Sequence, residues 1–187
     1  MGALFYLLCG VVLGMLGVWL FRKNIGFIAQ KPEDYEDAGP EFDVRKHLNG
    51  PIVCEGVIFG PFGRVSSRFI ADFEGSWEGD KGSLKERFTY DDGSTQNREW
   101  HLTIAENGSI RASADDVIGE GAGRQTGPAV KLNYDIKLPA ASGGHVLSTV
   151  DWMYLTPNGT IMNRSQFRKF GIKVAELVAT MRPKDAT

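Results

Sequence analysis

The sequence contains little cysteine and carries no excess of positive charge. Its two cysteines are Cys9, which falls within a long apolar run, and Cys54, which falls outside it, so a disulfide within one chain is not expected. The formal net charge is −2, and the basic residues are scattered along the chain rather than gathered into a stripe. This pattern argues against nucleic-acid binding, and the core must form without disulfides.

Motifs of the common catalytic and metal sites are also missing. The three histidines are widely separated and have no cysteine near them, so no zinc site is predicted (His47, His101, His145). No Gly-x-Ser-x-Gly motif marks a serine nucleophile. The glycine-rich segment 119–127 lacks the Gly-Lys-Ser/Thr ending of a phosphate-binding loop. We therefore predict no metal and no cofactor. Whether the protein is an enzyme stays open, with a non-enzymatic role favoured.

What the chain does have is an uncharged, mostly apolar run over residues 1–21, which ends at Arg22 and Lys23. A membrane core about 30 Å thick needs roughly 20 helical residues, so the length is sufficient to span it. A cleaved secretory signal would have basic residues before the run, a shorter apolar segment and a small-residue cleavage site, and none of these is present. Residues 1–23 are therefore predicted to be an uncleaved transmembrane anchor.

The rest of the chain divides into a short connection and one domain. Residues 24–41 contain prolines and many charged side chains, a composition typical of a linker. Residues 42–187 are numerous enough for one globular domain. Basic residues follow the span closely and none precedes it, so the positive-inside rule favours the cytoplasmic face for this domain (Arg22, Lys23, Lys31).

Alternation of apolar and polar residues dominates the domain. It is clearest over residues 130–138, where the even-numbered residues are apolar and the odd-numbered residues are polar. The apolar residues form the buried face of a predicted strand and the polar residues form its solvent-exposed face. Similar segments bring the count to about eight strands (52–59, 64–77, 82–91, 98–105, 109–118, 145–155, 160–170), and 172–181 is interpreted as a closing strand rather than a short helix. Glycine, asparagine and aspartate at the connections predict hairpins. The expected fold class is all-β: an antiparallel up-and-down, lipocalin-like β-barrel after one N-terminal transmembrane helix.

Several short motifs in this domain carry a family resemblance. They are HLNGP at 47–51, GSWEG at 75–79, ERFTY at 86–90, REW at 98–100, ADDVIG at 114–119, DWMYL at 151–155, NR at 163–164 and KFG at 169–171. Together they resemble a proteobacterial family of domains of unknown function, numbered 3833. The resemblance implies a lipocalin-like barrel without an established activity, often exported as a lipoprotein, although the lipoprotein cysteine signal is missing here. With the anchor, we expect a single-pass protein of the bacterial inner membrane. The resemblance favours a periplasmic domain, whereas the charge rule favours the cytoplasmic face.

Polar and aromatic residues with inward-facing positions are the candidates for a site. We expect Glu86 to be an inward carboxylate, paired with Arg98 or Arg164. Its role is either a structural ion pair or a ligand-orienting or acid–base function. Asp151 is expected to pair with Asn163 or Arg164 across a hairpin. The aromatic side chains are expected either to fill the core or to line an apolar cavity. The candidate ligand-binding residues are Glu86, Tyr90, Arg98, Trp100, Asp116, Asp151, Trp152, Tyr154, Asn163 and Arg164.

The segment 119–127 is interpreted as a strand end with a flexible, bulged connection, or as a lid over the barrel mouth. The predicted function is a membrane-tethered module that binds a lipid, fatty-acyl or other hydrophobic ligand. Two alternatives are an accessory or catalytic subunit in membrane lipid modification, and a filled barrel that recruits an unknown protein partner.

Overall fold

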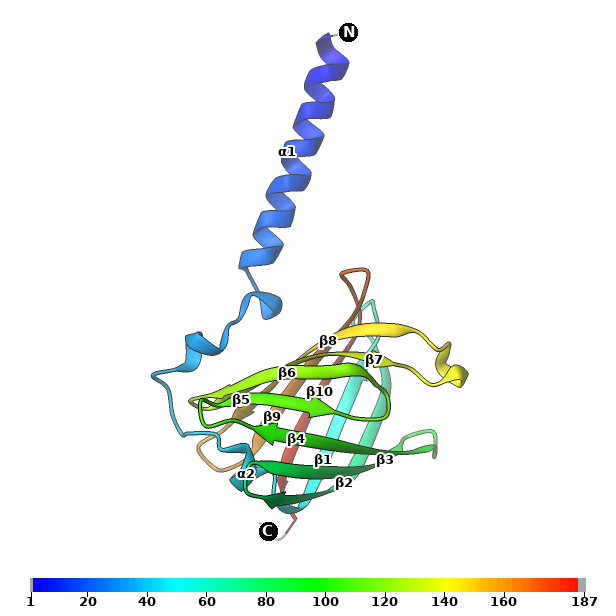
Figure 1. The fold of residues 1–187 in the computed structure, drawn as a ribbon. Helices are drawn as coiled ribbons and strands as arrows, with labels where there is room; N and C mark the ends of the chain where they lie inside the picture. The colour runs from blue at the N-terminus through cyan, green and yellow to red at the C-terminus, as the bar shows by residue number, and fades with distance from the viewer. Residues whose placement is uncertain (1, 185–187) are drawn as a thin grey trace.

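One long helix precedes a β-barrel in the computed structural model (Figure 1). The structure describes residues 2–184; Met1, the last three residues of the predicted domain, and the side chains of residues 21–24 and 141 lie outside the described part. Helix α1 (Gly2–Asn24) contains an apolar stretch, Gly2–Leu20, none of which is buried against the protein. It is therefore long and apolar enough to cross a membrane, a property that membrane anchors and signal sequences share.

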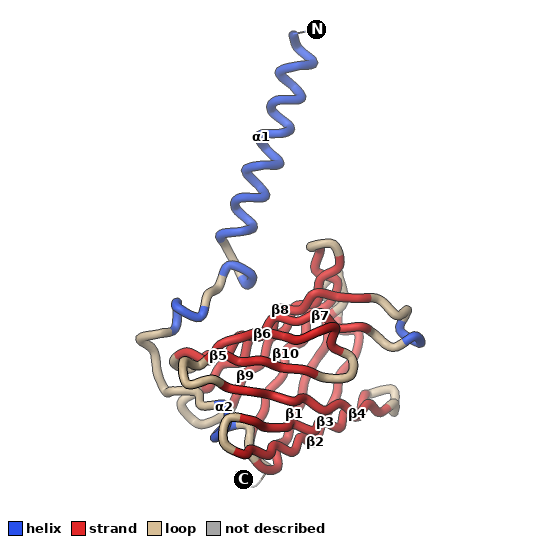
Figure 2. The backbone as a smooth tube through the Cα atoms, in the orientation of Figure 1, coloured by secondary structure: helices blue, strands red, loops and turns tan. Residues whose placement is uncertain are grey.

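Ten antiparallel strands form a closed barrel (Figure 2). Each strand pairs with its neighbours in the sequence, and the first closes against the last. The strands are β1 (Gly50–Phe59), β2 (Val65–Glu78), β3 (Lys81–Tyr90), β4 (Thr95–Ile104), β5 (Ser109–Ser113), β6 (Val117–Thr126), β7 (Ala129–Lys137), β8 (Val146–Leu155), β9 (Ile161–Lys169) and β10 (Ile172–Pro183). The predicted antiparallel up-and-down barrel is confirmed, but the predicted count of about eight strands is too low.

The missing strand is β6, which runs through the glycine-rich segment that the sequence suggests to be a connection. The single strand expected at 109–118 is in fact β5, a turn at 114–116, and the beginning of β6. Glycine is required inside β6 because a Cβ at Gly123 would lie 2.0 Å from the backbone oxygen of Lys131 on β7. The expected bulge is present: Gly119 has a φ of 70°, and the β6–β7 register shifts between Ile118 and Ala122.

One end of the barrel is closed by the short helix α2 (Val44–His47) and its flanking residues. Asp43 caps this helix by accepting a hydrogen bond from the backbone N–H of Arg45. The apolar side chains of the segment enter the core and are almost fully buried (Phe42, Val44, Leu48). Trp77 on β2 fixes the helix from the wall, since its Nε1–H donates to the backbone oxygen of Leu48 at 2.8 Å.

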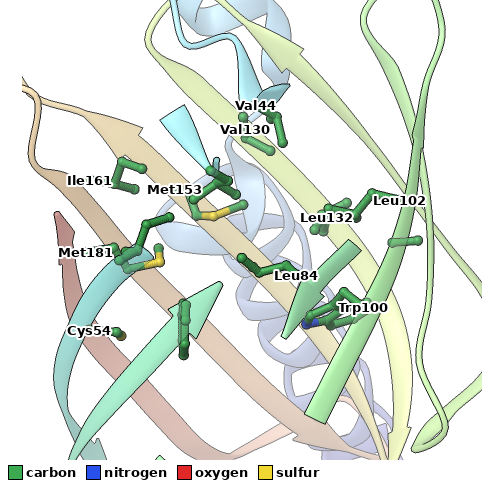
Figure 3. Close-up of a cluster of buried hydrophobic side chains, with 14 of the residues drawn as sticks. Val44, Cys54, Leu84, Trp100, Leu102, Val130, Leu132, Met153, Ile161 and Met181 are labelled. Atoms are coloured by element: carbon green, nitrogen blue, oxygen red, sulfur yellow. The ribbon is translucent and has the colours of Figure 1, made fainter. Parts of the chain in front are cut away.

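The core lies inside the barrel and is built from alternate residues of the strands. Figure 3 shows side chains from several strands converging, among them Leu84, Trp100, Leu132, Met153 and Met181. The opposite positions face outward, which is the alternation that the sequence displays.

The segment 24–41, predicted to be a linker, packs against the outside of the barrel. It contains two short 3-10 helices, η1 (Phe27–Ala29) and η2 (Pro32–Tyr35). Phe27 and Tyr35 form a small apolar cluster with Trp152, whose side chain is fully buried beneath them. The Gln30 side-chain oxygen accepts hydrogen bonds from Tyr35 and, at 2.7 Å, from Tyr154. The segment is therefore a docked connector, and a composition rich in charge does not reveal this because few side chains make the contact.

Candidate functional site

The barrel interior is mostly filled, but a cavity of about 110 Å³ remains. Apolar side chains from the strands and from α2 make most of its wall (including Val44, Leu84, Phe88, Leu132, Met153, Met181). Polar side chains contribute to the rest of the wall (Glu86, Arg98, Tyr134, Asp151, Asn163, Ser165). An engineered apolar cavity of about 150 Å³ binds benzene, so this space has room for a small apolar group.

Arg98 is the cation of this polar group, and it lies directly across the β3–β4 ladder from Glu86. Its Nε donates to the Asp116 carboxylate at 3.0 Å, and the two side chains are 13% and 22% exposed. The guanidinium also lies over the ring of Trp100, 4.1 Å from its centroid. Arg98 is therefore held between a carboxylate in the β5–β6 turn and an aromatic ring on its own strand.

Asp151 lies on β8 and is bonded to the neighbouring strand. It accepts hydrogen bonds from the Asn163 side-chain amide at 2.6 Å and from the Ser165 hydroxyl at 2.7 Å. Tyr134 on β7 is buried, and Arg98 lies 5.6 Å from the centroid of its ring. Because β3 and β4 are separated from β7, β8 and β9 in the strand order, the polar residues form a layer across the barrel interior.

The layer contains three carboxyl groups and one guanidinium, which changes the proton affinity of Glu86. Burial raises the pKa of Glu86 to about 8; Arg98 opposes this rise, whereas Asp151 and Asp116 reinforce it. Burial also raises the pKa of Asp151, against hydrogen bonds from Ser165, Asn163 and Tyr134 and the attraction of Arg98. Glu86 is therefore mostly protonated at neutral pH and carries an O–H group that can donate a hydrogen bond.

Two atoms of this layer lack a hydrogen-bond partner among residues 2–184. They are Oε2 of Glu86, whose residue is 9% exposed, and Nη2 of Arg98. A buried polar group without a partner is costly, by about 1–3 kcal/mol, and native proteins contain few of them. A protonated Glu86 and Arg98 are both donors, so together they are suited to bind an acceptor oxygen.

The structure brings together six of the ten predicted site residues: Glu86, Arg98, Trp100, Asp116, Asp151 and Asn163. Tyr90 lies near the β3–β4 turn, where its hydroxyl donates to Gln96 at 2.9 Å and its ring stacks on Phe88.

The other three predicted residues do not line the cavity, because they alternate with the inward positions of β8 and β9 (Trp152, Tyr154, Arg164). Trp152 and Tyr154 lie under the connector. Arg164 forms an ion pair with Glu176 at 2.6 Å. In the described part of the chain it is bonded to neither of its predicted partners, Glu86 and Asp151.

Two residues of the layer are missing from the prediction, Tyr134 and Ser165. Tyr134 belongs to the clearest alternating run in the sequence, and its position alone was a signal for an inward side chain. Ser165 follows Asn163 by two residues on β9 and therefore points the same way. For metal binding, the described residues include no group of three or more His, Cys, Asp or Glu side chains arranged to hold an ion.

The fold and the site define a lipocalin-like protein: a closed antiparallel barrel with a polar layer across its interior. The chain belongs to the DUF3833 family of proteins of unknown function, whose model matches residues 23–183. This match confirms the family that the motifs resemble, and it includes the docked connector.

Solved structures show the same fold at low sequence identity. Rv2717c from M. tuberculosis has a TM-score of 0.55 at 13% identity, over 79% of this chain and 99% of that one. The S-type phycobiliprotein lyase CPES from Guillardia theta has a TM-score of 0.57 at 8% identity, over 84% of this chain and 99% of that one. A DUF3598 protein from Nostoc punctiforme has a TM-score of 0.52 at 11% identity, over 78% of this chain and 50% of that one. No curated protein matches the chain.

Proposed function

We propose that the protein is a membrane-tethered module that binds a hydrophobic molecule bearing an uncharged carbonyl oxygen, such as an acyl ester. The observation that carries this proposal is a pair of buried donor atoms, Oε2 of protonated Glu86 and Nη2 of Arg98. Both atoms lack a hydrogen-bond partner among the described residues, and both residues lie on the wall of a mostly apolar cavity. A carbonyl oxygen accepts two hydrogen bonds, so it can accept one from each.

The surrounding charges favour an uncharged carbonyl over a carboxylate. Asp116 and Asp151 already face the single guanidinium of Arg98, and a third negative charge would have to share it. Burying such a charge without a partner costs several kcal/mol. The proposed ligand is therefore an ester, amide or ketone rather than a free fatty acid.

The size of the cavity limits how much of the ligand it can hold. At about 110 Å³ it is smaller than the ~300–1,000 Å³ typical of ligand pockets. The carbonyl and a short part of its chain fit, and a longer chain requires side chains to move. Met153 and Met181 line the cavity and are the flexible side chains that can do so.

The apolar helix α1 supplies the location in this proposal, since a membrane contains acyl esters in abundance. We propose that α1 spans the inner membrane once and holds the barrel beside it. The face of the membrane on which the barrel lies stays a prediction with two alternatives.

Lipid mass spectrometry on the full-length protein, extracted from its membrane, tests the proposal. The variant Ala179→Leu places a larger side chain into the cavity, whereas Thr180→Leu makes the neighbouring change on the outward face of β10. We expect an acyl ester to copurify with the wild type and with Thr180→Leu, and to be lost from Ala179→Leu. Absence of any bound acyl ester from the folded wild type would sink the proposal.

Catalysis in lipid modification is a second candidate, because a carboxyl with a pKa of about 8 is suited to general acid–base work. Glu86→Gln separates the two functions. A binding site keeps its ligand in this variant, since glutamine also donates a hydrogen bond, whereas an acid–base catalyst loses turnover while binding persists.

A further inference from the structure

Two hairpin tips at one edge of the barrel expose phenylalanine side chains. Phe62 in the β1–β2 turn and Phe170 in the β9–β10 turn are each 93% exposed. The nearby apolar residues Val65 and Ile172 are 55% and 65% exposed. Because β1 pairs with β10 in antiparallel register, both turns project from the same end of the barrel, and the two tips are neighbours.

The backbone at Phe170 has a conformation that disfavours a large side chain. Its φ is 51°, in the left-handed region, and Gly171 follows with a φ of 77°. Two-residue turns of this kind usually place asparagine or glycine at the first position. A phenylalanine there is strained and buries nothing in the barrel, so its role lies outside the fold.

The region around the two tips differs in charge from the other turns at the same end of the barrel. The segments 60–70 and 166–173 contain five basic residues and no acidic residue (Arg64, Arg68, Arg168, Lys169, Lys173). The β3–β4 and β5–β6 turns, at the same end, each contain two aspartates (Asp91, Asp92, Asp115, Asp116). Two of the five are in ion pairs, Arg68 with Asp91 and Lys173 with Glu176. Arg64 and Lys169 lie in or beside the two tips, and an apolar tip flanked by basic side chains is complementary to a membrane surface that contains anionic lipid.

The anchor is held on the same side of the barrel. Phe27, three residues after α1, lies against Arg164 on β9, with 4.7 Å between the ring centroid and the guanidinium carbon. The strand β9 continues from Arg164 to the Phe170 turn. Figure 1 shows α1 rising in the direction in which the β1–β2 and β9–β10 turns point.

We propose that Phe62 and Phe170 insert into the headgroup layer of the membrane that holds α1, with Arg64 and Lys169 on anionic lipid. This inference rests on the proposed function only for the membrane anchor. It gives the barrel a fixed tilt in which the end opposite α2 faces the lipid. A lipid acyl group can then reach the barrel without crossing water.

The test uses the full-length chain in nanodiscs, with p-benzoylphenylalanine in place of Phe62, Phe170 or, as a control, Asp92. Asp92 is exposed at the tip of the acidic β3–β4 turn, at the same end of the barrel. After illumination, mass spectrometry counts lipid adducts. We expect several-fold more adduct at positions 62 and 170 than at 92. Replacing phosphatidylglycerol by phosphatidylcholine, or introducing Arg64→Glu with Lys169→Glu, should lower that yield.

The outcomes are distinguishable from those of the proposed function. A chain that inserts into nanodiscs but gives no more adduct at 62 and 170 than at 92 overturns this inference alone. A chain that does not insert overturns the tether and this inference with it. Loss of ligand from Ala179→Leu concerns the cavity and leaves the adduct pattern unchanged.

Discussion

Protonation of Glu86 links the stability of the barrel to pH. Its pKa rises from an ordinary 4.5 to about 8, so at roughly 1.4 kcal/mol per pH unit full ionisation costs on the order of 5 kcal/mol. The folded state binds the proton of Glu86 more tightly than the unfolded state does, so protonation of Glu86 stabilises the fold. This contribution is complete below pH 4.5 and is lost as the pH rises through about 8. We expect Glu86→Gln to gain stability relative to the wild type between pH 5 and pH 9, measured by thermal unfolding. An equal difference at both pH values would contradict the burial of this carboxyl.

Arg98 is the second residue whose removal should be costly. Arg98→Met leaves the carboxylate of Asp116 partly buried without its partner, and we expect a loss of roughly 3–5 kcal/mol in urea unfolding. Arg98→Lys keeps the charge but loses the planar contact with Trp100, and a loss of about 1–2 kcal/mol is expected. Equal stability of the methionine variant and the wild type would show that the ion pair contributes nothing.

Sequence alternation could place Glu86 and Arg98 inside the barrel, because each lies in a regular strand with period two. It could not choose the partner of Arg98. That partner, Asp116, lies in a turn after β5 ends, and its position depends on where the strand stops. Alternation does place Trp152 on the face of β8 opposite to Asp151. It does not show that Trp152 is buried there, because that burial depends on the docked connector.

At the scale of elements, the close packing of β6 against β7 depends on glycine. Gly123→Ala places a Cβ 2.0 Å from the Lys131 backbone oxygen, and we expect it to cost more than about 3 kcal/mol or to prevent folding. Gly60→Ala is the control, since its Cβ comes no nearer than 3.8 Å to Arg64, and a change within about 0.5 kcal/mol is expected. Urea unfolding compares the two. A tolerated Gly123→Ala would show that β6 can move away from β7.

The strand β6 could not be predicted from its pattern because glycine replaces the apolar residues that would mark its inward face. Gly121 and Gly123 lack side chains because atoms of β5 and β7 occupy the space where a Cβ would lie. These contacts come from other parts of the sequence, so the pattern within β6 does not reveal them. The hairpins around β7, β8 and β9 were predictable, since each has alternation on both sides of a turn sequence.

At the scale of the whole molecule, the docked connector determines how freely the barrel moves beneath α1. Tyr35 packs on Trp152 and Tyr154, with ring centroids 5.4 Å and 5.6 Å apart, and it hydrogen-bonds to Gln30. Tyr35→Ala removes these contacts, whereas Tyr35→Phe keeps the ring and loses only the hydroxyl. We expect Tyr35→Ala to raise amide hydrogen exchange in residues 27–38 at least tenfold, with a smaller rise for Tyr35→Phe. A tenfold rise corresponds to a decrease of about 1.4 kcal/mol in the free energy of local opening.

The same variant separates the two contacts that orient the barrel. If the connector and the Phe62 and Phe170 tips act together, loosening the connector lets the barrel rotate about its remaining contact. Lipid adducts at position 92 should then increase in Tyr35→Ala nanodiscs, while adducts at 170 persist because the tip still binds lipid. An adduct pattern identical to the wild type, with the connector exchanging freely, would show that the tips alone fix the tilt. Loss of adducts at 170 would show that the docked connector is what brings the tips to the membrane.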